Sequence, residues 1–361
     1  MMKGLKNWRL FALMTALLVF LAGCGREEIS TLIPAGKVAQ DQFNLLILST
    51  AVMTFVIIVV TIIFILAIVK FRRSKLGDDM ISEQVEGSAK LEFIWTAVPI
   101  VLLLILAVPT VYSTFDLADV TAMDSVNDEG EQNHLTVNVT AYLYWWEFEY
   151  PEQGITTAQE LVVPTDERVY FNLISADIKH SFWIPSIGGK LDVNPENVNK
   201  FYLEFDKESD QLDDGVYFGK CAELCGPSHA LMDFKVKSVD RATFDEWVAS
   251  MQEEPEPAAE TVAQEGEELF GQSCINCHAV SGTEQAGVKS GPSLATFGDR
   301  NRVAGFMEHD EETLKNWIVD PQKYKPGNIM PDGETNNGGE EYSEEELDAL
   351  AAYLMGLTVE E

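Results

Sequence analysis

Four potential metal ligands lie within twelve residues of this chain, in the segment CAELCGPSHALM. They are the thiols of Cys221 and Cys225, the imidazole of His229 and the thioether of Met232. Thiolate and thioether ligands select Cu(I), zinc or iron–sulfur, and a nearby imidazole favours copper or zinc. Because zinc sites use Cys, His and carboxylate ligands, the thioether makes copper the leading candidate.

The number of copper ions is open at this stage. One Cys with two His and one Met would form a mononuclear blue-copper centre. Two thiolates could instead bridge two copper ions. His180 and His229 would then each bind one metal, with Met232 and a backbone carbonyl completing the shell. The simpler alternatives are a disulfide between Cys221 and Cys225 and a hydrogen-bonded core position for His180.

A second set of candidate ligands lies in the sequence CINCH. Cys274, Cys277 and His278 form the Cys-x-x-Cys-His signature of c-type haem attachment, in which the imidazole is the proximal iron ligand. A haem that only transfers electrons needs a sixth ligand, and Met330, on a loop before the last predicted helix, is favoured over Met307 and over a methionine within that helix. The alternatives to haem are a chance match and a thioredoxin-like redox pair.

The fifth cysteine, Cys24, ends an N-terminal export signal. A basic start, a short apolar run and two small residues precede it. The Leu-Ala-Gly-Cys end resembles a bacterial lipoprotein signal, in which the cysteine carries the lipid and becomes the first residue. We therefore predict a signal peptide at residues 1–23 and an external segment at 24–42. The alternative is an uncleaved anchor helix.

Two apolar segments can each span a bilayer. Residues 43–69 and 93–115 carry no charge, and both exceed the ~20 residues that a spanning helix needs. Four Lys and Arg residues directly follow the first span, so the positive-inside rule predicts that the connecting loop is cytoplasmic. The expected element is a transmembrane hairpin at residues 43–115, with spans at about 43–70 and 93–115 and everything that follows on the outer face of a bacterial cell membrane.

Two further domains are predicted after the hairpin. Short alternating runs separated by turns indicate an all-β sandwich or barrel at residues 116–252, closed by a helix at 241–251. A Pro/Ala/Glu-rich linker is predicted at 253–264. The last unit, 265–361, is small and all-α, and a unit of that size usually needs a cofactor for stability. Its three helical patterns cover residues 265–277, 311–319 and 343–357, the last with Ser343 as N-cap.

The formal net charge of −33 lies mostly after residue 115 and excludes a nucleic-acid partner. It indicates either a solvated surface or attraction of cationic partners. In the aromatic run YLYWW, Trp145 and Trp146 either pack the core or provide the point where electrons enter. Glu92, at the cytoplasmic start of the second span, is either an interfacial charge or part of a proton path.

Residues 40–240 resemble subunit II of a haem–copper cytochrome c oxidase. The resemblance rests on the hairpin, Glu92 before Ile-Trp-Thr, the YLYWW run, His180 before Ser-Phe-Trp-Ile-Pro, and the CAELCGPSHALM loop. It implies a cupredoxin-like fold, electrons entering at Trp145 or Trp146, a proton pathway beginning at Glu92, and the Glu223 side chain on magnesium or manganese at the border with subunit I. It also implies a dinuclear copper A centre. The ligands of this centre would be His180, Cys221, Cys225, His229, Met232 and the main-chain carbonyl of Glu223.

Residues 264–361 resemble a class I cytochrome c. The resemblance rests on the CINCH motif, on Gly-Pro-Ser-Leu at 291–294, on Trp317 near a haem propionate and on Met330 as distal ligand. The two families in tandem are similar to subunit II of bacterial caa-type oxidases. This implies electron transfer from an external donor (cytochrome c or quinol:cytochrome c reductase) to haem c, to copper A, and on to the oxygen-reducing, proton-pumping subunit I, with subunit III as a further partner.

Two other functions remain open from the sequence. The same architecture could serve a nitric oxide reductase, although Glu92 favours an oxidase that draws protons from inside. The chain could also be a stand-alone membrane-tethered electron carrier or copper-handling protein.

Overall fold

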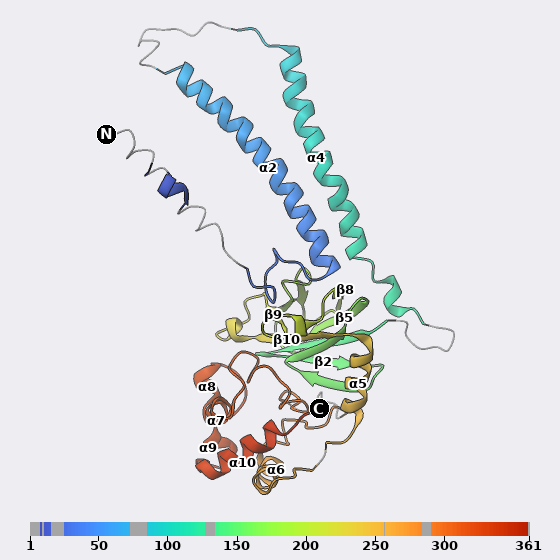
Figure 1. Ribbon diagram of the computed structural model, residues 1–361, viewed down its shortest axis with the longest axis vertical. Helices are drawn as coiled ribbons and strands as arrows, with labels where there is room; N and C mark the ends of the chain where they lie inside the picture. Colours follow the sequence, from blue (N-terminus) through green and yellow to red (C-terminus); the bar gives the residue numbers. More distant parts are fainter. Residues whose placement is uncertain are drawn as a thin grey trace.

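The computed structural model describes residues 8, 11–15, 25–72, 85–126, 134–255, 257–283 and 290–359. The predicted lipidation site, Cys24, lies outside these residues, as does most of the predicted signal peptide. In Figure 1 two long helices extend from one end of a β domain, and a smaller helical unit lies at its opposite end. The expected multidomain architecture of hairpin, β domain and all-α domain is confirmed.

The hairpin consists of α2 (Lys37–Lys70) and α4 (Ala89–Leu117). The most apolar stretch of each helix is entirely unburied within the described chain, as expected for helices that face lipid. Both helices extend beyond the charge-free runs: polar residues continue α2 and α4 at the end near the β domain, and α4 also begins four residues earlier at its remote end. At the end near the β domain, Lys37 Nζ lies 3.5 Å from an Asp116 carboxylate oxygen and links the two helices.

Within the described residues, ten strands form two five-stranded sheets, in the orders β3-β2-β1-β5-β8 and β4-β10-β9-β6-β7. Aromatic side chains fill the space between the sheets, and the Phe182 ring stacks on Phe234 at 4.7 Å and meets Trp146 edge-on at 5.6 Å. The strands are β1 (Thr136–Tyr142), β2 (Trp145–Tyr150), β3 (Ile155–Ala158), β4 (Glu160–Pro164), β5 (Arg168–Ser175), β6 (His180–Trp183), β7 (Leu191–Val193), β8 (Asn199–Glu204), β9 (Tyr217–Cys221) and β10 (Asp233–Val239). The expected closing helix is α5 (Arg241–Gln252).

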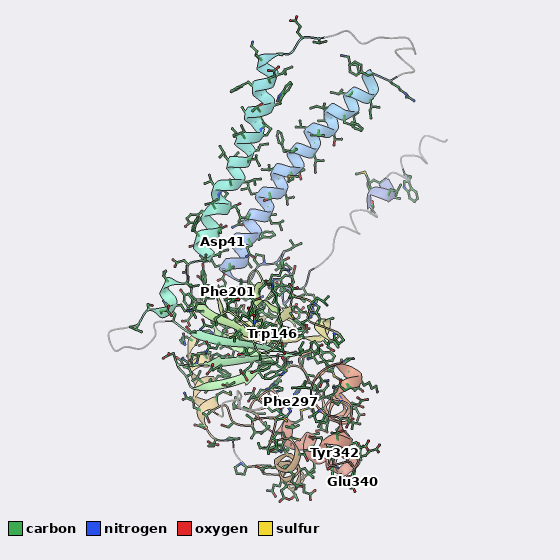
Figure 2. The ribbon with its side chains drawn as sticks, turned by 180° about the vertical axis from the view of Figure 1, so that it is seen from behind. Asp41, Trp146, Phe201, Phe297, Glu340 and Tyr342 are labelled. Carbon is green, nitrogen blue, oxygen red and sulfur yellow. The ribbon has the colours of Figure 1, made fainter. Side chains whose placement is uncertain are left out.

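The helical unit has a core of its own, and Figure 2 shows its residues Phe297 and Tyr342 well apart from Trp146 of the β domain. Its helices are α6 (Thr261–Ser273), α7 (Glu311–Val319), α8 (Pro321–Tyr324), α9 (Gly333–Asn336) and α10 (Glu344–Met355). The Ser343 N-cap is confirmed as part of a capping box with Glu346. Because α6 begins at Thr261, the non-helical part of the predicted linker ends at residue 260.

The segment that follows Cys24 packs on the β domain. Phe218 N–H donates to the carbonyl of Glu28 at 2.9 Å, and Ser186 Oγ donates to the carbonyl of Glu27 at 2.6 Å. Residues 25–36 therefore lie at the end of the β domain from which α2 departs (Figure 1).

The helical unit also contacts the β domain directly. Ser228 Oγ donates to the carbonyl of Pro326 at 2.7 Å, and Lys235 Nζ donates to the carbonyl of Gly305 at 3.0 Å. Further bonds join Gln159 Nε2 to Ala304 O (3.1 Å), Asn301 Nδ2 to Asp214 O (3.2 Å) and Lys237 Nζ to Asp299 O (3.2 Å). We refer to the surfaces joined by these bonds as the interdomain interface.

Candidate metal and haem sites

The first site is built by three strands of one sheet. Strand β9 ends at Cys221 and β10 begins after Met232, and the bond from Cys221 N–H to Met232 O (3.2 Å) closes the intervening loop. Strand β6 pairs with β9 in a register that places Phe182 opposite Cys221. The same pairing brings His180, the first residue of β6, to the base of the loop although it lies 41 residues earlier in the chain.

The donor atoms of this loop converge at metal-binding spacing. Cys221 Sγ lies 3.9 Å from Cys225 Sγ and 3.8 Å from His180 Nδ1. Cys225 Sγ lies 3.6 Å from His229 Nδ1 and 3.8 Å from Met232 Sδ. A disulfide needs about 2.05 Å between the sulfurs, whereas donors about 2.3 Å from a shared tetrahedral metal lie roughly 3.8 Å apart. The residues present therefore fit a metal centre held by two free thiols.

The backbone completes this donor set. The main-chain carbonyl of Glu223 lies 3.3 Å from Cys221 Sγ, as a carbonyl ligand to the same centre requires. His180 and Met232 are fully buried, while His229 and the Glu223 side chain are half-buried. Leu224, between the two cysteines, is 77% exposed, so the outer edge of the loop presents an apolar side chain to solvent.

The protonation of the two thiols is coupled. A hydrogen bond from the neighbouring Cys225 thiol lowers the pKa of Cys221, and the Cys221 thiolate in turn raises the pKa of Cys225. Burial alone would lower the pKa of His180, but its hydrogen bonds to Asp177 and Cys221 outweigh burial and raise it. Asp177 Oδ1 lies 2.8 Å from His180 Nε2 and so directs Nδ1 toward the sulfurs.

The sequence did not identify Asp177 as part of this site. Its only signal is a carboxylate three residues before a candidate ligand histidine, which is common on protein surfaces. The pairing depends on the turn between β5 and β6, where Ser175 and Asp177 form local hydrogen bonds.

The two tryptophans of the aromatic run occupy different environments. Trp146 is fully buried, donates from Nε1 to Met232 O at 3.3 Å, and meets the His180 ring edge-on at 6.2 Å. Trp145 is stacked on Tyr142 at 4.2 Å and lines a cavity between the β domain and the helical unit. Successive residues of β2 thus contact the metal-site loop and this cavity.

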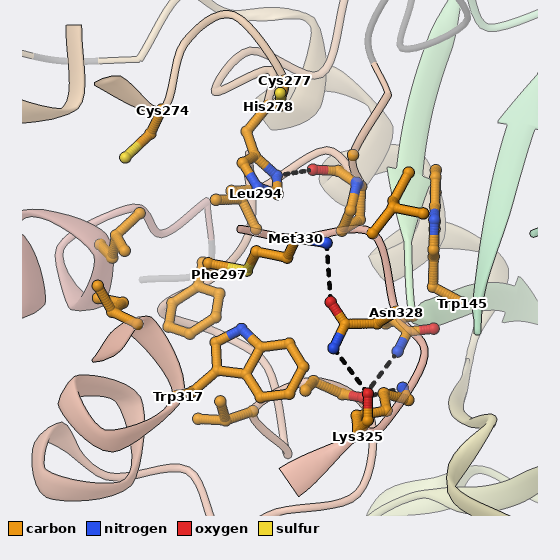
Figure 3. A pocket seen from close by; sticks show the side chains of 18 of the residues that line it. Trp145, Cys274, Cys277, His278, Leu294, Phe297, Trp317, Lys325, Asn328 and Met330 are labelled. Atoms are coloured by element: carbon orange, nitrogen blue, oxygen red, sulfur yellow. Dashed lines mark hydrogen bonds between the residues drawn. The ribbon is translucent and has the colours of Figure 1, made fainter. Parts of the chain in front are cut away.

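The two cysteines and the histidine of the CINCH motif lie on the wall of this cavity. Cys274, Cys277, His278 and Met330 line it together with Trp317 and other apolar side chains (Figure 3). His278 Nδ1 donates to Pro292 O at 2.7 Å, so Nε2 is the nitrogen that could ligate a metal. A Cβ at Gly291 would lie 2.8 Å from His278 Cε1, so glycine is needed beside the imidazole.

The cavity fits a covalently attached haem. Both thiols, the imidazole and one thioether meet in a single hollow whose remaining walls are mostly apolar side chains. Met307 and Met355 instead pack against the core of the helical unit. Two buried cations, Arg300 and Lys325, also line the cavity and were not found from the sequence, because neither lies in a motif or a periodic pattern.

Glu92 lies far from both sites. It is an exposed residue in the first turn of α4, at the end of the hairpin remote from the β domain (Figure 1). The described residues bring no other predicted site residue to it.

Comparison with family models gives matches in all three parts of the chain. Residues 37–112 match the transmembrane domain of cytochrome c oxidase subunit II, residues 152–239 match its periplasmic domain, and residues 263–358 match cytochrome c.

Known proteins match over the same regions. The chain is 54% identical over 363 residues to cytochrome c oxidase subunit 2 of Bacillus sp. (strain PS3), with 100% of both chains covered. It is 49% identical over 358 residues to cytochrome c oxidase subunit 2 of Bacillus subtilis, covering 98% of this chain and 99% of the relative. Quinol oxidase subunit 2 of Bacillus cereus is 31% identical over 248 residues, which is 68% of this chain and 81% of that protein.

Proposed function

Because the chain belongs to the cytochrome c oxidase subunit II family and carries a fused cytochrome c domain, we propose specific residues for its redox sites and for the connection between them. The protein is a membrane-anchored, electron-input subunit of a haem–copper oxidase complex, and its families imply copper A and haem c. The ligands, the route and the orientation in the membrane are the proposal.

The copper A ligands are His180, Cys221, Cys225, His229 and Met232, with the main-chain carbonyl of Glu223. The observation that carries this assignment is the separation of 3.9 Å between two free, buried thiols, each flanked by its own imidazole. Such a pair can bridge two metals, and bound copper then supplies one-electron storage shared between two ions. The protein contributes rigidity, since Asp177 and the β6–β9 pairing hold His180 in place.

Haem c is attached through Cys274 and Cys277, with His278 and Met330 as axial ligands. The bond from His278 Nδ1 to Pro292 O supports ligation through Nε2. Bound haem supplies one-electron exchange, and a Met ligand opposite His keeps its potential high. The buried apolar walls of the cavity exclude water from the site.

Electrons enter the β domain at Trp145 and reach the copper loop through Trp146. Trp145 lines the haem cavity, and the adjacent Trp146 contacts His180 and donates to Met232 O. The interdomain interface holds the copper site and the haem site in a fixed relative position. An external donor, either a cytochrome c or a quinol:cytochrome c reductase, therefore needs to reach only the haem domain.

The copper and haem domains lie on the outer face of the membrane. Residues 25–36 pack on the β domain, so export of Cys24 for lipidation would carry the β domain to the same side. Lys70 and Arg72 at the far end of α2 support a cytoplasmic loop. Glu92 lies at that end, where it would begin a proton pathway.

The edge of the copper loop faces subunit I. Exposed Leu224 and the half-buried Glu223 side chain form this edge, and Glu223 would hold a magnesium or manganese ion shared with subunit I. Subunit III is a further partner.

Metal analysis and electron paramagnetic resonance of the purified full-length chain test the ligand assignment. We expect two copper ions and one haem per chain, with the signal of a mixed-valence copper pair. Cys225→Ser should remove the mixed-valence signal while leaving the haem spectrum unchanged. Stoichiometric zinc in place of copper, or an unchanged signal in the variant, would contradict the assignment.

A further inference from the structure

The haem cavity is lined by two buried cations and by no carboxylate among its described residues. Arg300 and Lys325 are 6% and 3% exposed, in a chain whose net charge is −33. Burying an unbalanced charge is costly, so buried cations normally lie near an anion. The cavity is therefore built for a ligand that is largely apolar but carries negative charge.

Lys325 is the more unusual of the two cations. Its Nζ donates to the carbonyl of Ala304 at 2.8 Å, lies 5.4 Å from the centre of the Phe306 ring, and has no carboxylate within ion-pair distance in the described part of the chain. Burial lowers the pKa of Lys325 to about 7. Its direct contacts are thus one neutral acceptor and one aromatic ring. Asp233, beyond ion-pair distance, raises the pKa of Lys325 and Lys235 lowers it further, so no carboxylate of the described chain pairs with the ammonium group.

A second donor comes from the β domain. Trp145 is 7% exposed, and its buried Nε1 has no hydrogen-bond partner among the described residues. Because buried indole N–H groups usually have an acceptor, this one indicates an acceptor supplied by the contents of the cavity. Figure 3 shows Trp145 and Lys325 on the walls of the same cavity, with Asn328 between them.

Hydrogen bonds across the interdomain interface connect the backbone next to Trp145 with the surroundings of Lys325. Gln159 Oε1 accepts from Trp146 N–H at 3.0 Å, and Gln159 Nε2 donates to Ala304 O, the carbonyl that also accepts from Lys325. The side of the cavity that holds Lys325 is therefore the side that meets the β domain.

We propose that Lys325 and the indole N–H of Trp145 bind a carboxylate of the haem, so that the β domain completes the haem site of the helical unit. The proposal rests on the haem c function given above. A haem carries two propionate groups on an otherwise apolar macrocycle, which matches a cavity with apolar walls and two buried cations. The ammonium group of Lys325 then keeps this carboxylate ionised, and its positive charge favours the reduced haem.

A redox titration of the haem in the purified oxidase complex tests this assignment. Lys325→Gln keeps a donor for Ala304 O but loses the charge, whereas Lys325→Arg keeps the charge. Loss of a unit charge acting at ~10 Å through an effective dielectric of ~20 changes the ratio of reduced to oxidised haem by roughly tenfold. We expect Lys325→Gln to lower this ratio at a fixed applied potential by about that factor, and Lys325→Arg to remain close to wild type.

Two further readouts separate haem binding from a structural role. In Lys325→Gln the carboxylate loses its cation, so the haem potential should become dependent on pH in the neutral range. Trp145→Phe keeps the ring but loses the N–H, and it should shift the potential in the same direction by a smaller amount. If Lys325 only holds the 304 loop, Lys325→Gln will match wild type in potential and in pH dependence, and the proposal is overturned. The haem absorption spectrum of each variant reports separately on covalent attachment and axial ligation, so a failure of the proposed ligand set would be recognised independently.

Discussion

Replacing Lys235 with methionine should change how the stability of the β domain depends on pH. Lys235 is 1% exposed, and burial lowers its pKa from 10.5 to about 8. Four charged groups also act on it, the nearest being the Asp233 carboxylate at 3.9 Å: Asp233 and Glu160 raise this pKa, while Lys220 and Arg302 lower it further.

The sign follows from proton binding. Between pH 8 and 10.5 the unfolded chain holds the Lys235 proton more tightly than the folded chain, so the stability of the wild type rises with pH across this window. Because folding lowers the pKa of Lys235 by about 2.5, burying this lysine reduces the free energy of unfolding by about 3 kcal/mol at pH 7. The reduction falls to about 1.4 kcal/mol at pH 9.5. Methionine carries no such cost.

Methionine also loses two contacts of the lysine. One is the hydrogen bond to Gly305 O at 3.0 Å, and the other is the cation–π contact with Phe218 at 4.4 Å. At pH 9.5 Lys235, with a pKa of about 8, is neutral in the folded wild type and no longer makes the cation–π contact, while the hydrogen bond contributes about 1 kcal/mol. Lys235→Met should therefore be about 2 kcal/mol more stable than wild type at pH 7 and close to wild type at pH 9.5.

Urea unfolding of the full-length protein in detergent, followed by the copper absorption band, measures this difference. The assay compares wild type, Lys235→Met and Lys200→Met, whose lysine is exposed, at both pH values. We expect the wild type to gain about 2 kcal/mol over Lys235→Met between pH 7 and 9.5, while Lys200→Met follows the wild type. Parallel profiles for all three proteins would refute the argument.

Three further predictions concern the sites and the contact between them. Met330→His should retain covalent haem but lower its midpoint potential in a redox titration, because Met opposite His raises the potential. Asp177→Ala should weaken copper binding about 10–100-fold in a chelator competition, because His180 loses the partner that orients it. Gln159→Ala should lower the free energy of unfolding of the β domain in urea by about 1–3 kcal/mol, because the buried backbone N–H of Trp146 loses its acceptor.

Two of these predictions have matched control variants. Asp192 is a nearby carboxylate that pairs with exposed Lys179, so Asp192→Ala should leave copper affinity unchanged. The Gln153 side-chain oxygen has no hydrogen-bond partner in the part of the chain that the structure describes, so Gln153→Ala should cost less stability than Gln159→Ala. A haem potential in Met330→His equal to that of wild type would show that another residue provides the sixth ligand.

The sequence predicted elements whose signals are local. The Ser343 capping box and the helix at 311–319 were predicted because caps and helical periodicity act over a few residues. The three parts of the fold followed from hydropathy, strand alternation and composition. The start of α6 was missed because Pro/Ala/Glu composition marks a linker but does not show where the next helix begins.

Candidate ligands were also visible in the sequence, because the chemistry of a site fixes residue types at short spacing. The sequence did not predict which of Trp145 and Trp146 contacts the copper loop and which lines the haem cavity. Alternation along a strand predicts that the two face opposite sides, but which side meets the copper loop depends on the pairing of β6, β9 and β10. Asp177, Arg300 and Lys325 have no local signal, since each acts through contacts with distant parts of the chain.

The positions of Lys235 and Lys325 suggest an order for assembly of the two domains. The two lysines come from opposite sides of the interdomain interface and donate to the carbonyls of consecutive residues, Gly305 and Ala304. Lys235 has the Asp233 carboxylate at 3.9 Å, whereas Lys325 has no carboxylate partner in the described chain. Docking without haem would therefore bury the Lys325 charge unbalanced, while docking with haem would place a carboxylate beside it. It follows from the proposed site that haem attachment precedes stable docking, so that a haem domain without its cofactor would not cover Trp145.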